Sequence, residues 1–280
     1  MMVNPLKRSL FGIPCLWLLT GTLAMGPVLT LTLPVIAAVQ QPAEVNLTLL
    51  ETALTQFFQA TTFQVESEVT INAQGEQFKV NIDNHTSTLT VLPRRFVSEI
   101  KLGTQQYFIT SDGQTVWIYH RNRDRYREMS FEAFQDSEDS FFIGLASSFL
   151  LEIVRSLQQE QGNSAIDPAE LLSAILQFFT RDYQAAGLSL SQDTITQEGI
   201  DYTRYAYKTN GEDLTLVLWI DNQAQTLKKL QLLGSEQDIK INVQETILKQ
   251  TFNPIVDEKA FQFQPSPALK KVDDLPLEAF

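Results

Sequence analysis

Apolar and polar residues alternate along two long stretches of the chain, and this period of two predicts β-strands. The first stretch predicts six strands, over 63–71, 78–82, 86–92, 96–102, 106–110 and 115–120. The second predicts five more, over 188–197, 202–209, 214–220, 226–233 and 239–248. Short turns such as Ser111-Asp112-Gly113 and Asn210-Gly211 separate neighbouring strands, which indicates antiparallel meanders.

Apolar residues spaced three and four apart predict helices elsewhere. One helix is expected over 46–60, capped by Asn46, and a second begins at Asp139. A third begins at Asp167-Pro168-Ala169-Glu170, with Asp at the N-cap, Pro at N1 and Glu at N3, and it stops at Gly187. Residues 139–187 therefore form a helical insert between the two β regions.

This order of elements predicts an α+β fold that is mainly antiparallel β. The simplest arrangement is one sheet of about 10–11 strands with helices on one face. We expect a single domain over 39–265, followed by a flexible, Pro-rich C-terminal tail over 266–280.

The N-terminus has the layout of a secretory signal peptide. Lys7 and Arg8 precede a run without charge from Ser9 to Val39, and small residues lie near a cut site at about Ala38. We expect residues 1–38 to be removed and the protein to be exported to the periplasm. The alternative is an uncleaved N-terminal anchor, since the run is long enough to span a bilayer.

Composition excludes several classes of function. Cys15, within the signal segment, is the only cysteine, so a mature chain has no disulfide, thiolate metal site or Cys nucleophile. The formal net charge of −12 disfavours nucleic acid and anionic lipid headgroups as partners.

No catalytic constellation is visible. His85 and His120 are the only histidines, and they lack recognisable partners for a triad or a zinc site. The sequence contains no nucleophile elbow, zincin motif or phosphate-binding loop. We therefore expect a protein that is not an enzyme, with no metal and no cofactor.

An arginine-rich segment stands out in this acidic chain, with Arg121, Arg123, Arg125 and Arg127 at every second position. On one strand they would share a face that could contact an acidic partner. The favoured interpretation is a solvated hairpin with its turn at Asn122 to Asp124, which would divide the arginines between two strands.

Two elements have more apolar surface than one interface needs. Residues 141–154 are apolar on nearly every helical face, and Leu214, Leu216, Leu218 and Ile220 alternate with Thr215, Val217 and Trp219. Either an apolar cavity lies between sheet and helices, or the two form a thick, filled core.

Two segments resemble the signature of periplasmic lipoprotein carriers of the LolA type. They are Pro93-Arg94-Arg95-Phe96 and the stretch Ser111-Asp112-Gly113 to Trp117-Ile118-Tyr119, and the ending from Phe252-Asn253-Pro254 to Pro265 is similar too. The resemblance, to the superfamily that includes LolA, LolB and RseB, implies a half-open β-barrel with helices in its concave side. It also implies an apolar interior that receives acyl chains. Leu92 stands where the carriers have an arginine that latches the helical lid.

The combined hypothesis is an exported binding protein for acyl chains or lipoproteins, expected to be a monomer. The candidates for lining an apolar cavity are Phe96, Trp117, Tyr119, Phe142, Leu145, Phe149, Leu216 and Leu218. The alternative is an envelope sensor or regulator of the RseB type, which binds a membrane-associated protein through Arg121, Arg123, Arg125 and Arg127.

Overall fold

The computed structural model describes residues 45–277, apart from 77–78, 162–166, 211–212, 237–238 and 276. The predicted signal segment, 1–38, lies outside these residues.

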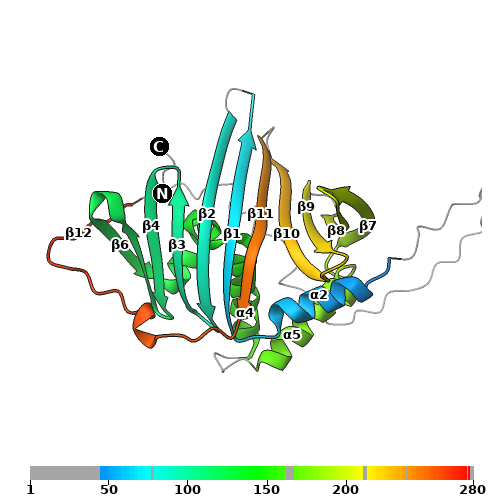
Figure 1. Cartoon of the computed structure of the whole chain (residues 1–280), viewed down its shortest axis with the longest axis horizontal. Helices are drawn as coiled ribbons and strands as arrows, with labels where there is room; N and C mark the ends of the chain where they lie inside the picture. The colour runs from blue at the N-terminus through cyan, green and yellow to red at the C-terminus, as the bar shows by residue number, and fades with distance from the viewer. Residues whose placement is uncertain are drawn as a thin grey trace, which may run out of the picture.

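The described strands form one sheet of twelve, in the order β12-β6-β5-β4-β3-β2-β1-β11-β10-β9-β8-β7. Neighbouring strands are antiparallel, except that β12 runs parallel to β6. The sheet curves without closing, and helices lie on its concave side (Figure 1). The predicted class, a mainly antiparallel α+β fold with a half-open sheet, is confirmed. The strands are β1 (Thr62–Gln74), β2 (Lys79–Val91), β3 (Arg95–Leu102), β4 (Gln105–Asp112), β5 (Thr115–His120), β6 (Arg125–Ser130), β7 (Leu188–Gln197), β8 (Ile200–Thr209), β9 (Leu214–Asp221), β10 (Thr226–Glu236), β11 (Ile239–Phe252) and β12 (Lys270–Lys271).

The helices differ in what they cover. Helix α2 contacts β9 and β10 and packs against α5, whereas α4 reaches the central strand β11 (Figure 1). Helix α3 and the 3-10 turn η4 lie over the other half of the sheet, against β2, β3, β5 and β6. The helical segments are α2 (Thr48–Phe58), α3 (Phe131–Gln135), α4 (Leu145–Gln161), α5 (Pro168–Gln177), the short turns η3 (Arg121–Arg123), η4 (Glu138–Ile143) and η6 (Glu258–Phe261), and the π-turn η5 (Phe178–Asp182).

The predicted strands need three changes. The two strands expected over 78–82 and 86–92 are one strand, β2, because Asn84 and His85 continue its alternation and form no turn. Strand β6 is the second strand of the predicted arginine hairpin, for which no range was given, and β12 of the C-terminal segment was not predicted.

The helix starts are partly as predicted. Asp167 caps α5 by accepting from the Ala169 amide, with Pro168 in the first turn, and such a cap contributes about 1 kcal/mol. Asp139 caps no helix. It pairs with Arg127, and the segment around it forms η4, which ends at Gly144 before α4 begins. Asn46 accepts from the Thr48 amide one residue before the N-cap position, Leu47.

The C-terminal segment, which begins at η6 and includes the predicted tail from residue 266, packs onto the sheet. Lys270 and Lys271 pair with Arg125 and Tyr126 of β6, and Leu275 is buried. The sequence suggested a flexible tail because of its prolines, but its apolar residues Val272, Leu275 and Leu277 join a core cluster and hold it in place.

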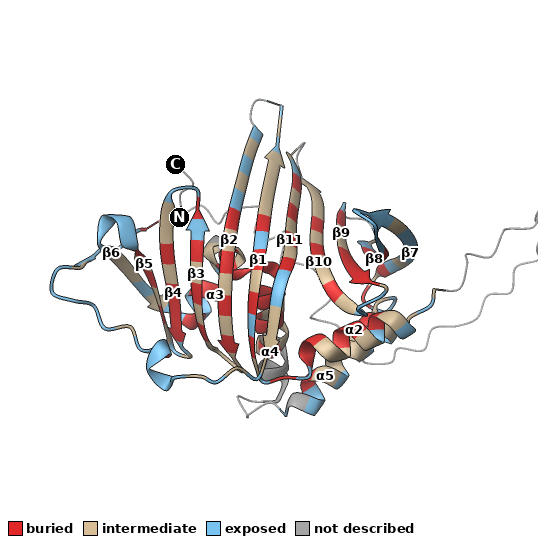
Figure 2. Cartoon of the chain, viewed as in Figure 1, coloured by how far each residue is buried: buried red, intermediate tan, exposed pale blue. Residues whose placement is uncertain are grey.

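Burial alternates along the central strands, as an amphipathic sheet requires. On β1 the buried side chains are Phe63, Val65, Ser67 and Val69, and their neighbours in sequence are exposed or half-buried (Figure 2). The buried series faces the helices, so the candidate functional site lies between sheet and helices.

Candidate functional site

The eight cavity candidates do not come together in one place. Leu145 and Leu218 are buried in an apolar cluster under α2, α4 and α5, with Phe149 and Leu216 partly buried beside them. Phe96 and Phe142 belong to a second cluster, under α3 and η4. Trp117 and Tyr119 point to the opposite, convex face, because β5 buries the alternate series Val116, Ile118 and His120.

The first cluster, here the large cluster, joins the sheet to the helices of the insert. Phe179 lies at its centre, with its ring 5.8 Å from Phe149 and 5.2 Å from Tyr207. The Tyr207 hydroxyl donates to the Phe179 carbonyl at 2.7 Å, and burial raises the pKa of Tyr207. Many apolar side chains at the margin of this cluster stay partly exposed, among them Phe141, Phe149, Ile153, Leu172, Leu176, Phe178, Tyr183, Leu190 and Leu216.

The second cluster, here the small cluster, has few partly buried side chains at its margin among the described residues. Phe96 packs on Phe134 with a ring separation of 5.4 Å, and Leu275 of the C-terminal segment is buried with them. A hollow of about 10 Å³ remains between α3, η4 and α4. That volume is close to the minimum for a single water and far too small for a hydrocarbon chain.

Buried apolar side chains of the sheet and of the helices meet in both clusters. The apolar surplus predicted from the sequence therefore lies between sheet and helices.

A polar strip separates the two clusters on the concave face. Thr88 and Ser98 hydroxyls lie 2.8 Å apart, and Thr86 lies 3.1 Å from Ser98. Thr88 also donates to the Ile143 carbonyl at 2.8 Å, which fixes the end of η4 to the sheet. The strip consists of Asn84, Thr86, Thr88 and Thr90 on β2, Ser98 on β3, Ser67 on β1 and Glu245 on β11, all of them buried.

Glu245 fastens the start of α4. Its carboxyl accepts from the Ala146 amide and from the Ser67 hydroxyl, both at 2.7 Å, and from the Leu145 amide. These bonds satisfy helix N-terminal N–H groups that would otherwise lack partners. Burial raises the pKa of Glu245, and the three hydrogen bonds oppose that shift.

Gly144 allows this contact. Its φ is +95°, and a Cβ built there would lie 2.6 Å from Glu245 Oε1. Sequence reasoning missed both residues, although a signal existed: Glu245 occupies the inward phase of the series Ile241, Val243, Ile247. An acid in that phase indicates a buried polar contact.

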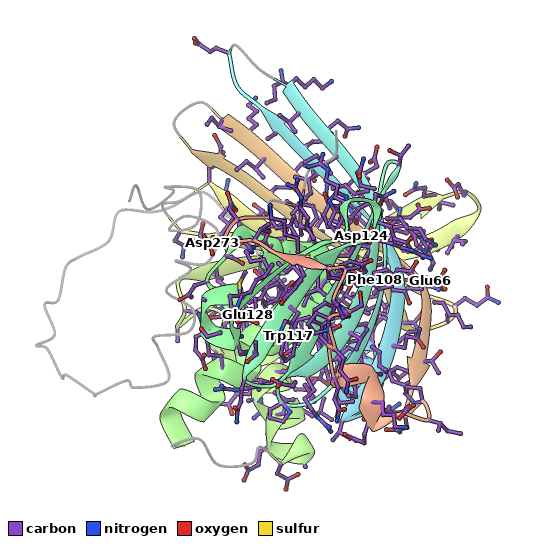
Figure 3. All side chains as sticks on the ribbon, turned by 90° about the vertical axis from the view of Figure 1, so that its left-hand side faces the viewer. Glu66, Phe108, Trp117, Asp124, Glu128 and Asp273 are labelled. Atoms are coloured by element: carbon purple, nitrogen blue, oxygen red, sulfur yellow. The ribbon has the colours of Figure 1, made fainter. Side chains whose placement is uncertain are left out.

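The convex face carries its own aromatic group. Phe263 of the C-terminal segment packs on Tyr126 at 5.3 Å and on Trp117 and Tyr119 at 6.1 Å each. Figure 3 shows the molecule from the end of the sheet where β6 and β12 lie. Trp117, Phe108, Asp124 and Glu128 are labelled there. Trp117 and Tyr119 therefore hold the C-terminal segment and do not line the concave side.

The predicted arginine turn is present, and it divides the four arginines. Arg121 and Arg123 lie in η3, Asp124 adopts a left-handed backbone with φ +50°, and Arg125 and Arg127 follow on β6. Arg127 pairs with Asp139 and lies 3.6 Å from Asp274, so it joins η4 and the C-terminal segment to the sheet. The other three are exposed.

The two arginines of the Pro93-Arg94-Arg95-Phe96 motif have structural roles. Arg94 lies over the Phe131 ring and pairs with Glu132 of α3 at 2.9 Å. Arg95 lies over the Phe261 ring and pairs with Glu258 of η6. Together they tie α3 and the C-terminal segment to the margin of the small cluster.

A hollow of about 460 Å³ lies over β9, β10, β11 and β1, lined mainly by polar residues such as Asn72, Thr215 and Asn242. Within the described ranges, no three His, Cys, Asp or Glu side chains gather as a metal-ligand set. None of the helices in the described part of the chain is long and apolar enough to cross a membrane.

Comparisons with known proteins are limited to structure. No protein-family profile matches the sequence, and no curated protein matches it. A search of solved structures finds an uncharacterized conserved protein from Thermus thermophilus, at 8% identity and TM-score 0.38, covering 80% of this chain and 96% of that one.

Two further solved structures are of named proteins. MucB in complex with MucA(peri) has 10% identity and TM-score 0.34, covering 80% of this chain and 61% of that one. A LolA superfamily protein from Nitrosomonas europaea has 10% identity and TM-score 0.30, and the match covers 77% of this chain and 96% of that one. At such values the assignment of the fold depends on the sheet and helices described above.

Proposed function

We propose that this protein is an exported, non-enzymatic binding protein of the bacterial envelope, which holds acyl chains or a lipid-modified partner between its sheet and its helical insert. One observation carries the proposal: the large cluster joins the insert to the sheet, and its margin is only partly buried. A ligand chain would replace the insert's side chains against β8, β9 and β10.

The energy of such binding is sufficient. Burial of a methylene contributes about 0.8 kcal/mol, so a C16 chain offers roughly 12 kcal/mol before ordering costs. The chain would take over apolar contacts that the insert gives up, so opening need not expose the sheet to water.

The charge of the protein agrees with this ligand class. With a net charge of −12, the chain disfavours nucleic acid and anionic headgroups, while an uncharged hydrocarbon chain is unaffected. We propose a periplasmic location and a monomer that works without metal or cofactor.

The test is binding of a fluorescent fatty-acid methyl ester, which is an uncharged acyl chain, to the protein after removal of co-purified lipid, with native mass spectrometry to count bound chains. Leu216→Asp, at the margin of the large cluster, should weaken binding at least tenfold. Leu248→Asp is the matched control, because Leu248 is 47% exposed and outside both clusters. A wild-type protein that takes up no lipid, or equal affinities in the two variants, would refute the proposal.

A second candidate is an envelope regulator that binds a membrane-associated protein partner. It is supported by the three exposed arginines, 121, 123 and 125, at one end of the sheet of an acidic protein. Replacing Arg123 and Arg125 by Glu should abolish capture of an acidic partner from envelope extracts. If the variant captures the same proteins as wild-type protein, this second candidate function is refuted.

A further inference from the structure

Asn84 is the least explained side chain of the concave face. It is only 4% exposed, and neither its Nδ2 nor its Oδ1 has a hydrogen-bond partner. Leaving a buried amide unpaired costs about 1–3 kcal/mol for each group, and an apolar residue would avoid that cost. Thr90, on the same strip, also has a buried hydroxyl without a partner.

Asn84 lies beside the large cluster. Val69, a member of that cluster, pairs with Asn84 on one side and with Glu245 on the other. Asn84 and Glu245 therefore lie in one row across three neighbouring strands, on the concave face. A chain in the large cluster could have its polar end at this row without crossing the small cluster.

We propose that Asn84 binds the polar linkage of an acylated ligand, and that this linkage is an amide. The inference rests on the proposed function, since it places a head-end contact beside the chain site. An Asn side chain offers both a donor and an acceptor, and a secondary amide has the complementary acceptor and N–H donor. An ester lacks the donor.

Glu245 adds selectivity at the same row. Its carboxyl lies in a buried, poorly solvated space, and such a space disfavours a ligand carboxylate because desolvation penalises the charged form. A free fatty acid is therefore a poorer fit than an uncharged amide. The hydroxyls of Thr86 and Thr88 already bond to Ser98 and Ile143, so the unpaired groups of the strip on β2 are the two of Asn84 and the hydroxyl of Thr90, and only Asn84 offers both a donor and an acceptor on an amide.

The experiment compares two probes that differ at one atom: N-palmitoylethanolamine, an amide, and 2-hydroxyethyl palmitate, its ester. Wild-type protein should bind the amide about tenfold more tightly. Asn84→Leu should remove this preference and should leave the melting temperature unchanged or higher. Asn84→Ala serves as a second variant in case Leu does not fit.

The control is Asn81→Leu, on the same strand but exposed on the other face. It should keep the tenfold preference. An unchanged preference in both Asn84 variants would overturn the inference while the proposed chain site stands. A wild-type protein that binds neither probe would refute the proposed function, and this inference with it.

Discussion

The large and small clusters lie under one sheet, yet they are closed in different ways. Among the described residues, the small cluster has 13 buried members and 5 partly buried ones, whereas the large cluster has 28 and 17. The large cluster thus has proportionally more apolar surface at its margin. Partial exposure of this kind marks a region where local opening costs less than global unfolding.

The polar contacts beside the two clusters are also of different kinds. Ion pairs of Arg94, Arg95 and Arg127 tie α3, η4 and the C-terminal segment around the small cluster. By contrast, α4 is fastened to the central strands beside the large cluster by the Glu245 carboxyl. The two halves are therefore held differently: ion pairs lie at the margin of the small cluster, and buried hydrogen bonds hold the start of α4 beside the large cluster.

The largest effect is expected from equivalent Phe→Ala changes in the two clusters. Phe134→Ala should lower the free energy of unfolding by about 4 kcal/mol, since it leaves a cavity in a closed core. Phe179→Ala removes a similar volume, but it should mainly speed hydrogen exchange in α4 and α5. Urea unfolding and amide exchange measure both. If Phe179→Ala instead speeds exchange throughout the sheet, the two halves do not differ as described.

The next effect concerns Glu245. Glu245→Ala should lower the free energy of unfolding by about 2–3 kcal/mol, because it leaves the Ala146 and Leu145 amides and the Ser67 hydroxyl without their hydrogen-bond acceptor. Glu245→Gln keeps an acceptor and should cost about 1 kcal/mol. Glu68→Gln, exposed on the neighbouring strand, is the control and should change nothing measurable. Equal losses for Ala and Gln would show that the hydrogen bonds do not matter.

A pH series separates the charge of Glu245 from its hydrogen bonds. Because burial raises the pKa of Glu245, the folded state holds its proton more tightly than the unfolded state. Its contribution to stability is therefore fully present below the ordinary glutamate pKa and is lost as the pH rises through the raised value. Relative to Glu245→Gln, wild-type protein should lose stability with rising pH. A gain over that range would contradict the assignment.

The smallest effect is expected on the convex face. Phe263→Ala removes a half-buried ring from Trp117, Tyr119 and Tyr126 and should cost about 1 kcal/mol. Acyl-chain affinity should stay the same, because this contact lies on the side opposite the helices. Tryptophan fluorescence and titration with the uncharged acyl-chain probe test both parts; a changed affinity would place the convex face in the site.

The sequence predicted the sheet because alternation and short turns are local signals. It predicted the Asp167 cap and the arginine turn for the same reason. It did not place Trp117 and Tyr119, since alternation shows which residues share a face but not which face meets the helices. The face of β5 that meets the helices is known only from the structure, in which Val116 and Ile118 are buried and α3 contacts this strand.

The site was harder to predict because its polar contacts are distant in sequence. Glu245 meets Ala146 across 99 residues, and no local pattern specifies that pair. The packing between sheet and helices could not be predicted either, since the number of apolar residues does not say which of their side chains meet.

Photo-crosslinking with a diazirine-labelled palmitoyl chain, mapped by mass spectrometry, tests the central claim most directly. The account predicts adducts on α4, α5 and strands β8, β9 and β10, around Phe149, Phe179 and Leu218. Adducts confined to the small cluster or to the convex face, or none at all, would contradict it.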